Sequence, residues 1–147
     1  MKLLNTLLAT ILSFSSFLIA SQVYANDYAE QKVVYHVNVN DAKRHNSVLG
    51  NIQNHINGVG AERIDVKVVM HGAGIELLRN AKKDPQVQAK VDNLKLQGVE
   101  FKVCANTLRK KNIKIEELYD AKTEDVVTAG VAEIAALQQK GYVYLRP

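Results

Sequence analysis

The chain is organised around one stretch, Gly98-Val-Glu-Phe-Lys-Val-Cys-Ala-Asn-Thr-Leu108. Its apolar residues Val99, Phe101 and Val103 alternate with charged ones, which is the period of two expected of a half-buried β-strand. The alternation runs directly into Cys104, and the polar residues that follow are typical of a helix start. The stretch therefore predicts a strand that ends in a cysteine and is followed at once by a helix.

Cys104 is the only cysteine of the chain and its strongest potential nucleophile. Asn106 and Thr107 can open the helix after it, because short polar side chains accept hydrogen bonds from the first free N–H groups. A helix N-terminus lowers the pKa of a nearby thiol below its free value of about 8.5. The residue chemistry leaves three alternatives open, since a lone cysteine is buried as an inert apolar filler, paired between chains, or held reactive.

The first 25 residues are interpreted as a cleaved export signal. Lys2 supplies positive charge, the stretch from Leu3 to Ala20 is largely apolar, and Val23 and Ala25 fit a signal-peptidase site. A retained membrane anchor is the competing interpretation, because the apolar stretch approaches the roughly 18 residues of a spanning helix. The serines within it favour removal. We expect cleavage after Ala25, a periplasmic protein without a stable membrane anchor, and one domain over residues 26–147.

Composition argues against several classes of function. The chain has 19 basic and 15 acidic residues, and its formal net charge of +4 is too slight and dispersed for a nucleic-acid partner. The densest basic run, Arg109-Lys-Lys111, is interpreted as a solvated helix end. One cysteine, and no histidine pair at the spacing of a known metal motif, argue against a structural zinc site. We expect no metal and no cofactor.

Strands and helices alternate along the chain and are joined by short turns. We expect strands at 32–39, 64–71, 99–104, 125–129 and 142–145, and helical segments at 41–57, 75–80, 84–97, 106–111, 115–119 and 131–140. This alternation predicts βαβ units and a mostly parallel, five-stranded sheet with helices on both faces.

Ligands of such sheets bind outside the carboxyl ends of the strands, where the strand order reverses. In the flavodoxin-like order 2-1-3-4-5 this point lies between the first and third strands, so the loop after Val39 should face the same crevice as Cys104. Asn38, His71 and Gly72 stand at strand ends and would shape the crevice. His71 titrates near neutrality and can bind an anion or donate a proton, although a strand-end histidine is more often hydrogen-bonded in a turn.

Helical periodicity predicts which faces are buried. The buried stripe is expected at Val48, Leu49, Ile52 and Ile56 in the first helix, and at Val131, Ile134, Ala135 and Gln138 in the last. His45 and His55 should then lie on the exposed side of the first helix. His36 is expected to be packed within the first strand.

Three runs of the chain carry a resemblance to a known family. They are Val99-Glu-Phe-Lys-Val-Cys-Ala-Asn-Thr-Leu108, His71-Gly-Ala-Gly-Ile-Glu-Leu-Leu78 and Thr128-Ala-Gly-Val-Ala-Glu-Ile-Ala-Ala-Leu-Gln-Gln-Lys-Gly-Tyr142. From Lys32 to Pro147 the chain resembles the DsrE/DsrF-like family, in its branch with the Cys-x-Asn-Thr pattern. The resemblance implies a flavodoxin-like, three-layer α/β sandwich and a homotrimer or homohexamer.

The resemblance also implies a role for Cys104. The best-understood branches of the family relay sulfur as a persulfide on a cysteine, and Cys104 stands at the matching strand end. Cys104 would then accept and transfer sulfane sulfur, with Asn106 and Thr107 positioning it. The implied partner is a sulfur donor or acceptor protein or a small inorganic sulfur compound such as thiosulfate or polysulfide. The alternative is a non-catalytic, oligomeric binding or assembly module with a structural cysteine.

Overall fold

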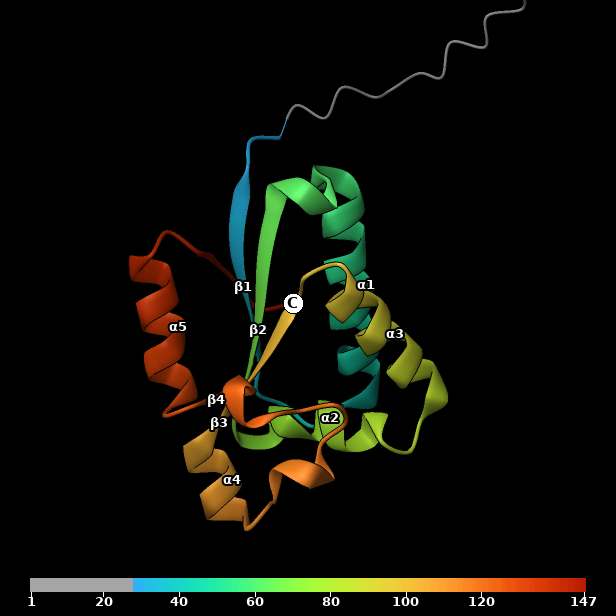
Figure 1. The fold of residues 1–147 in the computed structure, drawn as a ribbon, viewed down its shortest axis with the longest axis vertical. Helices are drawn as coiled ribbons and strands as arrows, with labels where there is room; N and C mark the ends of the chain where they lie inside the picture. Colours follow the sequence, from blue (N-terminus) through green and yellow to red (C-terminus); the bar gives the residue numbers. More distant parts are fainter. Residues whose placement is uncertain (1–27) are drawn as a thin grey trace, which may run out of the picture.

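A computed structural model describes residues 28–147 (Figure 1). The expected export signal and its cleavage site after Ala25 lie outside the described residues. The strands are β1 (Gln31–Val37), β2 (Ile64–Met70), β3 (Glu100–Cys104), β4 (Val126–Val127) and β5 (Val143–Leu145). The α-helices are α1 (Ala42–Val59), α2 (Glu76–Ala81), α3 (Pro85–Leu96), α4 (Ala105–Lys111) and α5 (Gly130–Gln139). Short 3-10 helices occupy Ala61–Arg63, Gly72–Ile75, Ile115–Glu117 and Thr123–Asp125.

The five strands form one parallel sheet, which confirms the predicted α/β class. The mostly parallel five-stranded sheet is consistent with the predicted flavodoxin-like fold. The strand order is β4-β3-β2-β1-β5, so the order 2-1-3-4-5, from which the position of the crevice was predicted, is wrong. From β1 to β4 each strand is added beside the previous one, and the chain then returns past the sheet to place β5 outside β1. As a consequence β2 separates the strand that carries Cys104 from β1.

The direction of these connections decides which face each helix covers. Crossovers between parallel strands are right-handed, so connections that run in opposite directions along the sheet place their helices on opposite faces. The connections that carry α1 and α3 run from β1 towards β3, whereas the connection that carries α5 runs back. In agreement, α1 and α3 cover one face and α5 the other, while α2 and α4 lie beyond the carboxyl ends of the strands (Figure 1).

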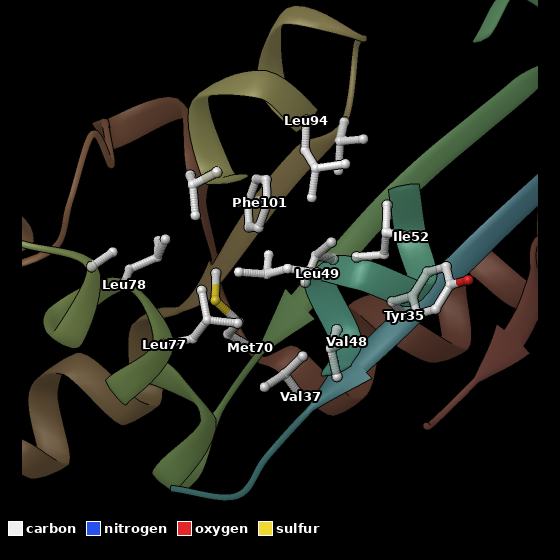
Figure 2. Close-up of a cluster of buried hydrophobic side chains, with 14 of the residues drawn as sticks. Tyr35, Val37, Val48, Leu49, Ile52, Met70, Leu77, Leu78, Leu94 and Phe101 are labelled. Atoms are coloured by element: carbon white, nitrogen blue, oxygen red, sulfur yellow. The ribbon is translucent and has the colours of Figure 1, made fainter. Parts of the chain in front are cut away.

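The face towards α1 and α3, here called the apolar face, carries most of the core. Alternate residues of β3 contribute Phe101 and Val103 to it, and both are at most 1% exposed. Figure 2 shows Phe101 beside Leu94 of α3 and near Leu49 of α1. The predicted stripe of α1 is confirmed. Its members are Val48, Leu49, Ile52 and Ile56.

The face towards α5, here called the polar face, has a much smaller apolar cluster. It consists of Val34, Val69, Ile134, Leu137 and Tyr142. The stripe predicted for α5 is wrong except at Ile134, because Val131 is 65% exposed and Leu137 is buried instead. Residues 130, 134 and 137 fall on one helical face at spacings of four and three, and this is the face turned to the sheet.

Two histidines of α1 lie differently from their prediction. His45 is buried, and its Nε2 lies 2.7 Å from the carbonyl oxygen of Val39. The ring of His55 is bonded to the Tyr35 hydroxyl at 3.0 Å and to Gln31 at 2.7 Å. His45 therefore links α1 to the loop after β1, and His55 links α1 to β1 itself. Among residues 28–147, no helix is long and apolar enough to cross a membrane.

Candidate functional site

Cys104 is the last residue of β3 and the residue from which α4 starts. The helix begins at Ala105, one residue earlier than expected, so Asn106 and Thr107 lie inside its first turn instead of capping it. The N-cap position of α4 is Cys104 itself, whose backbone is extended and whose side chain makes no capping hydrogen bond. The predicted strand-to-helix junction at the cysteine is thus present, and the first N–H groups of α4 lie next to the sulfur.

The Cys104 side chain is 5% exposed, yet it lines a cavity of about 500 Å³ that is open to solvent. Burial by itself raises the pKa of the thiol. The Thr107 hydroxyl and the backbone N–H groups of Gly130, Thr107 and Asn106 act in the opposite sense and outweigh it, so that the pKa of Cys104 lies below its ordinary value. The site therefore favours a thiolate that a small molecule can reach.

Thr107 connects the thiol to the end of β2. Its side chain is buried, and its Oγ1 accepts a hydrogen bond from the N–H of Gly72 at 2.8 Å. Because the oxygen accepts that bond, the hydroxyl proton remains free to point at the sulfur. Gly72 has a φ of 57°, in the left-handed region that glycine adopts without strain. The Gly72–Thr107–Cys104 contact thus depends on a turn that a larger residue would disfavour.

His71 lies beside Cys104 on the polar face of the sheet. Met70 is paired with Val103 in the parallel register, so the next residues, His71 and Cys104, stand side by side where the strands end. Both line the same cavity. Gly130 closes one side of His71, since a Cβ atom added to Gly130 would lie 2.9 Å from the Cβ of His71. The first residue of α5 must therefore be small for the imidazole to keep this position.

Asn38 is not part of this cavity. Its side chain accepts a hydrogen bond from Arg146 at 3.1 Å, and it lines a separate, small hollow beside β1. The structure therefore brings together Cys104, Asn106, Thr107, His71 and Gly72 but leaves Asn38 apart. The strand order is the reason, because β2 stands between β1 and β3. Within the cavity, the side chain of Asn106 is exposed and accepts a hydrogen bond from Arg109 at 2.6 Å, so only its N–H serves the sulfur.

Several residues of the site were not anticipated from the sequence. Gly130, Ala129 and Val131 form one wall, although Gly130 was interpreted only as the end of a strand. Lys110 and Lys111 form another, although their run was interpreted as a solvated helix end. Lysines at the end of a helix give no sign that a cavity lies beside them, because that depends on how α4 is placed against α5.

The charge of the cavity has one sign. Its lining by the described residues includes Lys110 and Lys111 and no carboxylate, and N–H groups from the first turn of α4 and from Gly130 of α5 are directed at the sulfur within it. A concave site lined by positive charge raises the local concentration of anions. Among residues 28–147 there is no cluster of three or more histidine, cysteine or acidic side chains that could hold a metal ion. The chemistry available here is that of a thiolate, a histidine and hydrogen-bond donors.

Comparisons with known proteins agree with the fold, and the matches cover most of the described chain. The family model described as DsrE/DsrF-like matches residues 31–147. Among solved structures, the chain is similar to a protein of unknown function, MTH1491, from Methanobacterium thermoautotrophicum, with 30% sequence identity and a TM-score of 0.68. That match covers 80% of this chain and 99% of the other. A comparison with curated proteins finds no significant match. On the family match, the chain belongs to the DsrE/DsrF-like family.

Proposed function

We propose that the protein carries sulfane sulfur as a persulfide on Cys104. The observation that carries the proposal is a reachable thiol whose pKa is lowered by four hydrogen-bond donors inside a cavity. Only the thiolate is a good nucleophile towards sulfur, and a persulfide anion is stabilised by the same donors. The membership of a family associated with sulfur relay supports the same chemistry. Within that family we assign the chain to the Cys-x-Asn-Thr branch.

Loading and unloading are two exchanges at sulfur. In the first, the Cys104 thiolate attacks the terminal sulfur of a donor, a new S–S bond forms to Sγ, and the donor's own S–S bond breaks. The electron pair of the broken bond leaves with the donor fragment. In the second, an acceptor thiolate attacks the sulfur carried by Cys104, and the electron pair of that S–S bond returns to Sγ. Neither exchange requires an external oxidant or reductant.

The charge of the cavity suggests an anionic donor, such as polysulfide, thiosulfate or a persulfide at the end of a partner chain. Lys110 and Lys111 would attract it, and the absence of a carboxylate from the lining leaves it unopposed. We further propose that the protein acts in the periplasm after cleavage behind Ala25, as a homotrimer or homohexamer. The intact mass of the chain recovered from the periplasm tests export and cleavage. The molar mass of the folded protein in solution tests the oligomeric state.

A non-catalytic assembly module remains the second candidate, and one observation favours it. Cys104 is only 5% exposed, as a cysteine that merely fills space would be. In that case Cys104→Ser would alter stability alone. The two functions therefore differ in what the thiol does and not in the fold.

The test is the intact mass of the protein after incubation with polysulfide or with tetrathionate. We expect the wild type to gain sulfur from both and to return to its original mass when a thiol acceptor is added. Cys104→Ser should gain nothing and keep its fold, as judged by circular dichroism. A wild-type chain that stays unmodified, with its thiol closed to alkylating reagents, would eliminate the persulfide function and leave the assembly module.

A further inference from the structure

A chain of three side chains leads from the cavity to the surface. Nε2 of His71 lies 2.6 Å from Nε2 of His36, and Nδ1 of His36 lies 2.7 Å from the hydroxyl of Tyr144. The residues come from the end of β2, from β1 and from β5, so the chain crosses neighbouring strands of the polar face. Tyr144 is 37% exposed, which places the far end of the chain in contact with water.

The near end of the chain is open to the cavity. His71 lines the cavity with Cys104, and its second ring nitrogen, Nδ1, has no hydrogen-bond partner among the described residues. Nor is that nitrogen sealed in the protein, since the described part of the chain holds no buried side-chain nitrogen without a partner. Within the described chain, Nδ1 of His71 is therefore an unpaired, solvent-accessible nitrogen on a residue that lines the same cavity as Cys104.

The surroundings of both imidazoles favour the neutral form. Burial, the neighbouring His71 and Arg146 together lower the pKa of His36 to about 4, and burial followed by Arg146 lowers the pKa of His71. The two rings also overlap, with centroids 4.7 Å apart, so that two positive charges here would repel each other. Lys110 and Lys111, from the wall of α4, line the same cavity as His71.

In such a pair the tautomers are coupled. A neutral imidazole carries one N–H and one bare nitrogen, so the bond between the two Nε2 atoms has a donor and an acceptor. If the Tyr144 hydroxyl donates to His36, then His36 carries its proton on Nε2 and donates to His71, and His71 carries its proton on Nδ1. In the reverse arrangement every bond points the other way, and Nδ1 of His71 is bare. Switching from one to the other moves one proton along the whole chain.

We infer that Tyr144, His36 and His71 form a proton relay that serves sulfur transfer at Cys104. The inference rests on the proposed function, and it assigns to that site the group that exchanges protons with the sulfur donor and acceptor. His71 is the group that meets them. His36 and Tyr144 are positioning residues that act through His71.

The protons balance over one cycle. During loading from a persulfide, the S–S bond of the donor breaks, and its thiol sulfur takes a proton from Nδ1 of His71. His71 regains a proton on Nε2 from His36, His36 regains one on Nδ1 from Tyr144, and Tyr144 is replenished by water. During unloading, an acceptor thiol gives its proton to the bare Nδ1 of His71 as its sulfur attacks, and the chain returns a proton to water through Tyr144.

The leaving group offers an internal control. A persulfide of glutathione expels a basic thiolate, which leaves faster when an acid protonates it, whereas tetrathionate expels thiosulfate, a weak base that needs no proton. The experiment measures the rate of the mass gain at Cys104 with each donor, over a range of pH, in the wild type, Tyr144→Phe, His36→Gln and His71→Gln. Tyr144→Phe removes only a hydroxyl and its hydrogen bond to His36 from an exposed position, so the fold should be retained in this variant.

We expect His71→Gln to slow the reaction with glutathione persulfide about 100-fold and Tyr144→Phe to slow it about tenfold, with altered pH profiles. The rates with tetrathionate should stay within about twofold of the wild type, because that leaving group needs no general acid. Equal slowing with both donors would mean that the three residues only support the fold, and unchanged rates with both would mean that they carry no proton. Either result overturns the relay while the persulfide function stands. A wild type that reacts with neither donor overturns both.

Discussion

The two faces of the sheet differ in what covers them. The apolar face is covered by α1 and α3, and its strand residues are buried and mostly apolar. Among residues 28–147 the polar face is covered by α5 alone, and beyond its small apolar cluster it carries partly hydrated ion pairs along β2 and β3. In one of these contacts Lys67 reaches Asp65 at 2.9 Å, and in another Lys102 reaches Glu100 at 2.7 Å.

Strand β3 contributes to both faces at once. Phe101 and Val103 enter the core, whereas Glu100, Lys102 and Cys104 lie on the other side, because successive side chains of a strand alternate. Cys104 therefore belongs to the face that is incompletely covered. A fully covered face excludes water and ligands from its side chains, while a face with one helix leaves room for a cavity at the end of the strands. The candidate site therefore lies where the covering of the sheet is incomplete.

The largest difference in stability is expected between substitutions of two adjacent residues, one on each face of the sheet. Phe101→Ala removes a ring from the apolar face and should lower the free energy of unfolding by about 3–5 kcal/mol, from lost burial and the cavity left behind. Lys102→Ala removes a partly hydrated ion pair on the polar face and should cost about 0–1 kcal/mol. Chemical denaturation of both variants measures the difference. Similar losses would show that the polar face is as tightly packed as the apolar one.

Substitutions of two glycines compare the helix on the polar face, α5, with a helix on the apolar face, α1. Gly130→Ala places a Cβ atom 2.9 Å from the Cβ of His71, so it should cost about 1–3 kcal/mol by overpacking and displace a donor from Cys104. Gly50 lies in α1 with no atom within 4 Å of an added Cβ, and Gly50→Ala should stabilise the helix by about 0.5–1 kcal/mol. Thermal melts give the stabilities. If Gly130→Ala melts as the wild type does and reacts with alkylating reagents at the same rate, then the contact with His71 does not restrict the size of residue 130.

The elements of this fold could be predicted from the sequence because their signals are local. The alternation in β3, the helix starts expected at 41 and 84 and the stripe of α1 each depend on neighbouring residues. All are confirmed, with Asp41 and Asp84 as the N-caps of α1 and α3. The strand expected at 125–129 is reduced to Val126–Val127, because residues 123–125 form a 3-10 turn that was not recognised. Strand order has no local signal, since it depends on which strand each connection reaches.

The site was predictable where it depends on one junction and not where it depends on packing. Cys104 and the helix after it follow from one stretch of sequence, and His71 follows from the end of a strand. Asn38 was included only because of the assumed strand order. Gly130 and the link from His36 to Tyr144 were missed, since they join segments that are brought together only when α5 and β5 fold back across β1.

A smaller effect is expected from one hydroxyl in the site. Thr107→Val removes a donor from the sulfur and the acceptor of the Gly72 N–H, so the pKa of Cys104 should rise and stability should fall by about 1 kcal/mol, the value of one hydrogen bond. The rate of alkylation against pH measures the pKa. Thr107→Ser keeps the hydroxyl and is the control, with a profile close to that of the wild type. An unshifted profile in the valine variant would mean that the backbone donors suffice to hold the thiolate.

The last effect is a dependence of stability on pH that should come mainly from the polar face. His36 has its pKa lowered from 6.5 to about 4 in the folded protein, so between these values the unfolded chain binds a proton that the folded chain does not. Stability must then rise with pH from about 4 to about 6.5 and lose this dependence outside that window.

His36→Gln should flatten the slope in that window. His55, fastened to the apolar face, has a pKa lowered only by burial, so His55→Gln is the matched control and should flatten the slope less. Urea denaturation at a series of pH values gives both slopes. Equal flattening by the two variants would mean that burial alone lowers the pKa of His36, with no contribution from His71 and Arg146. The polar face would then differ from the apolar face in packing alone.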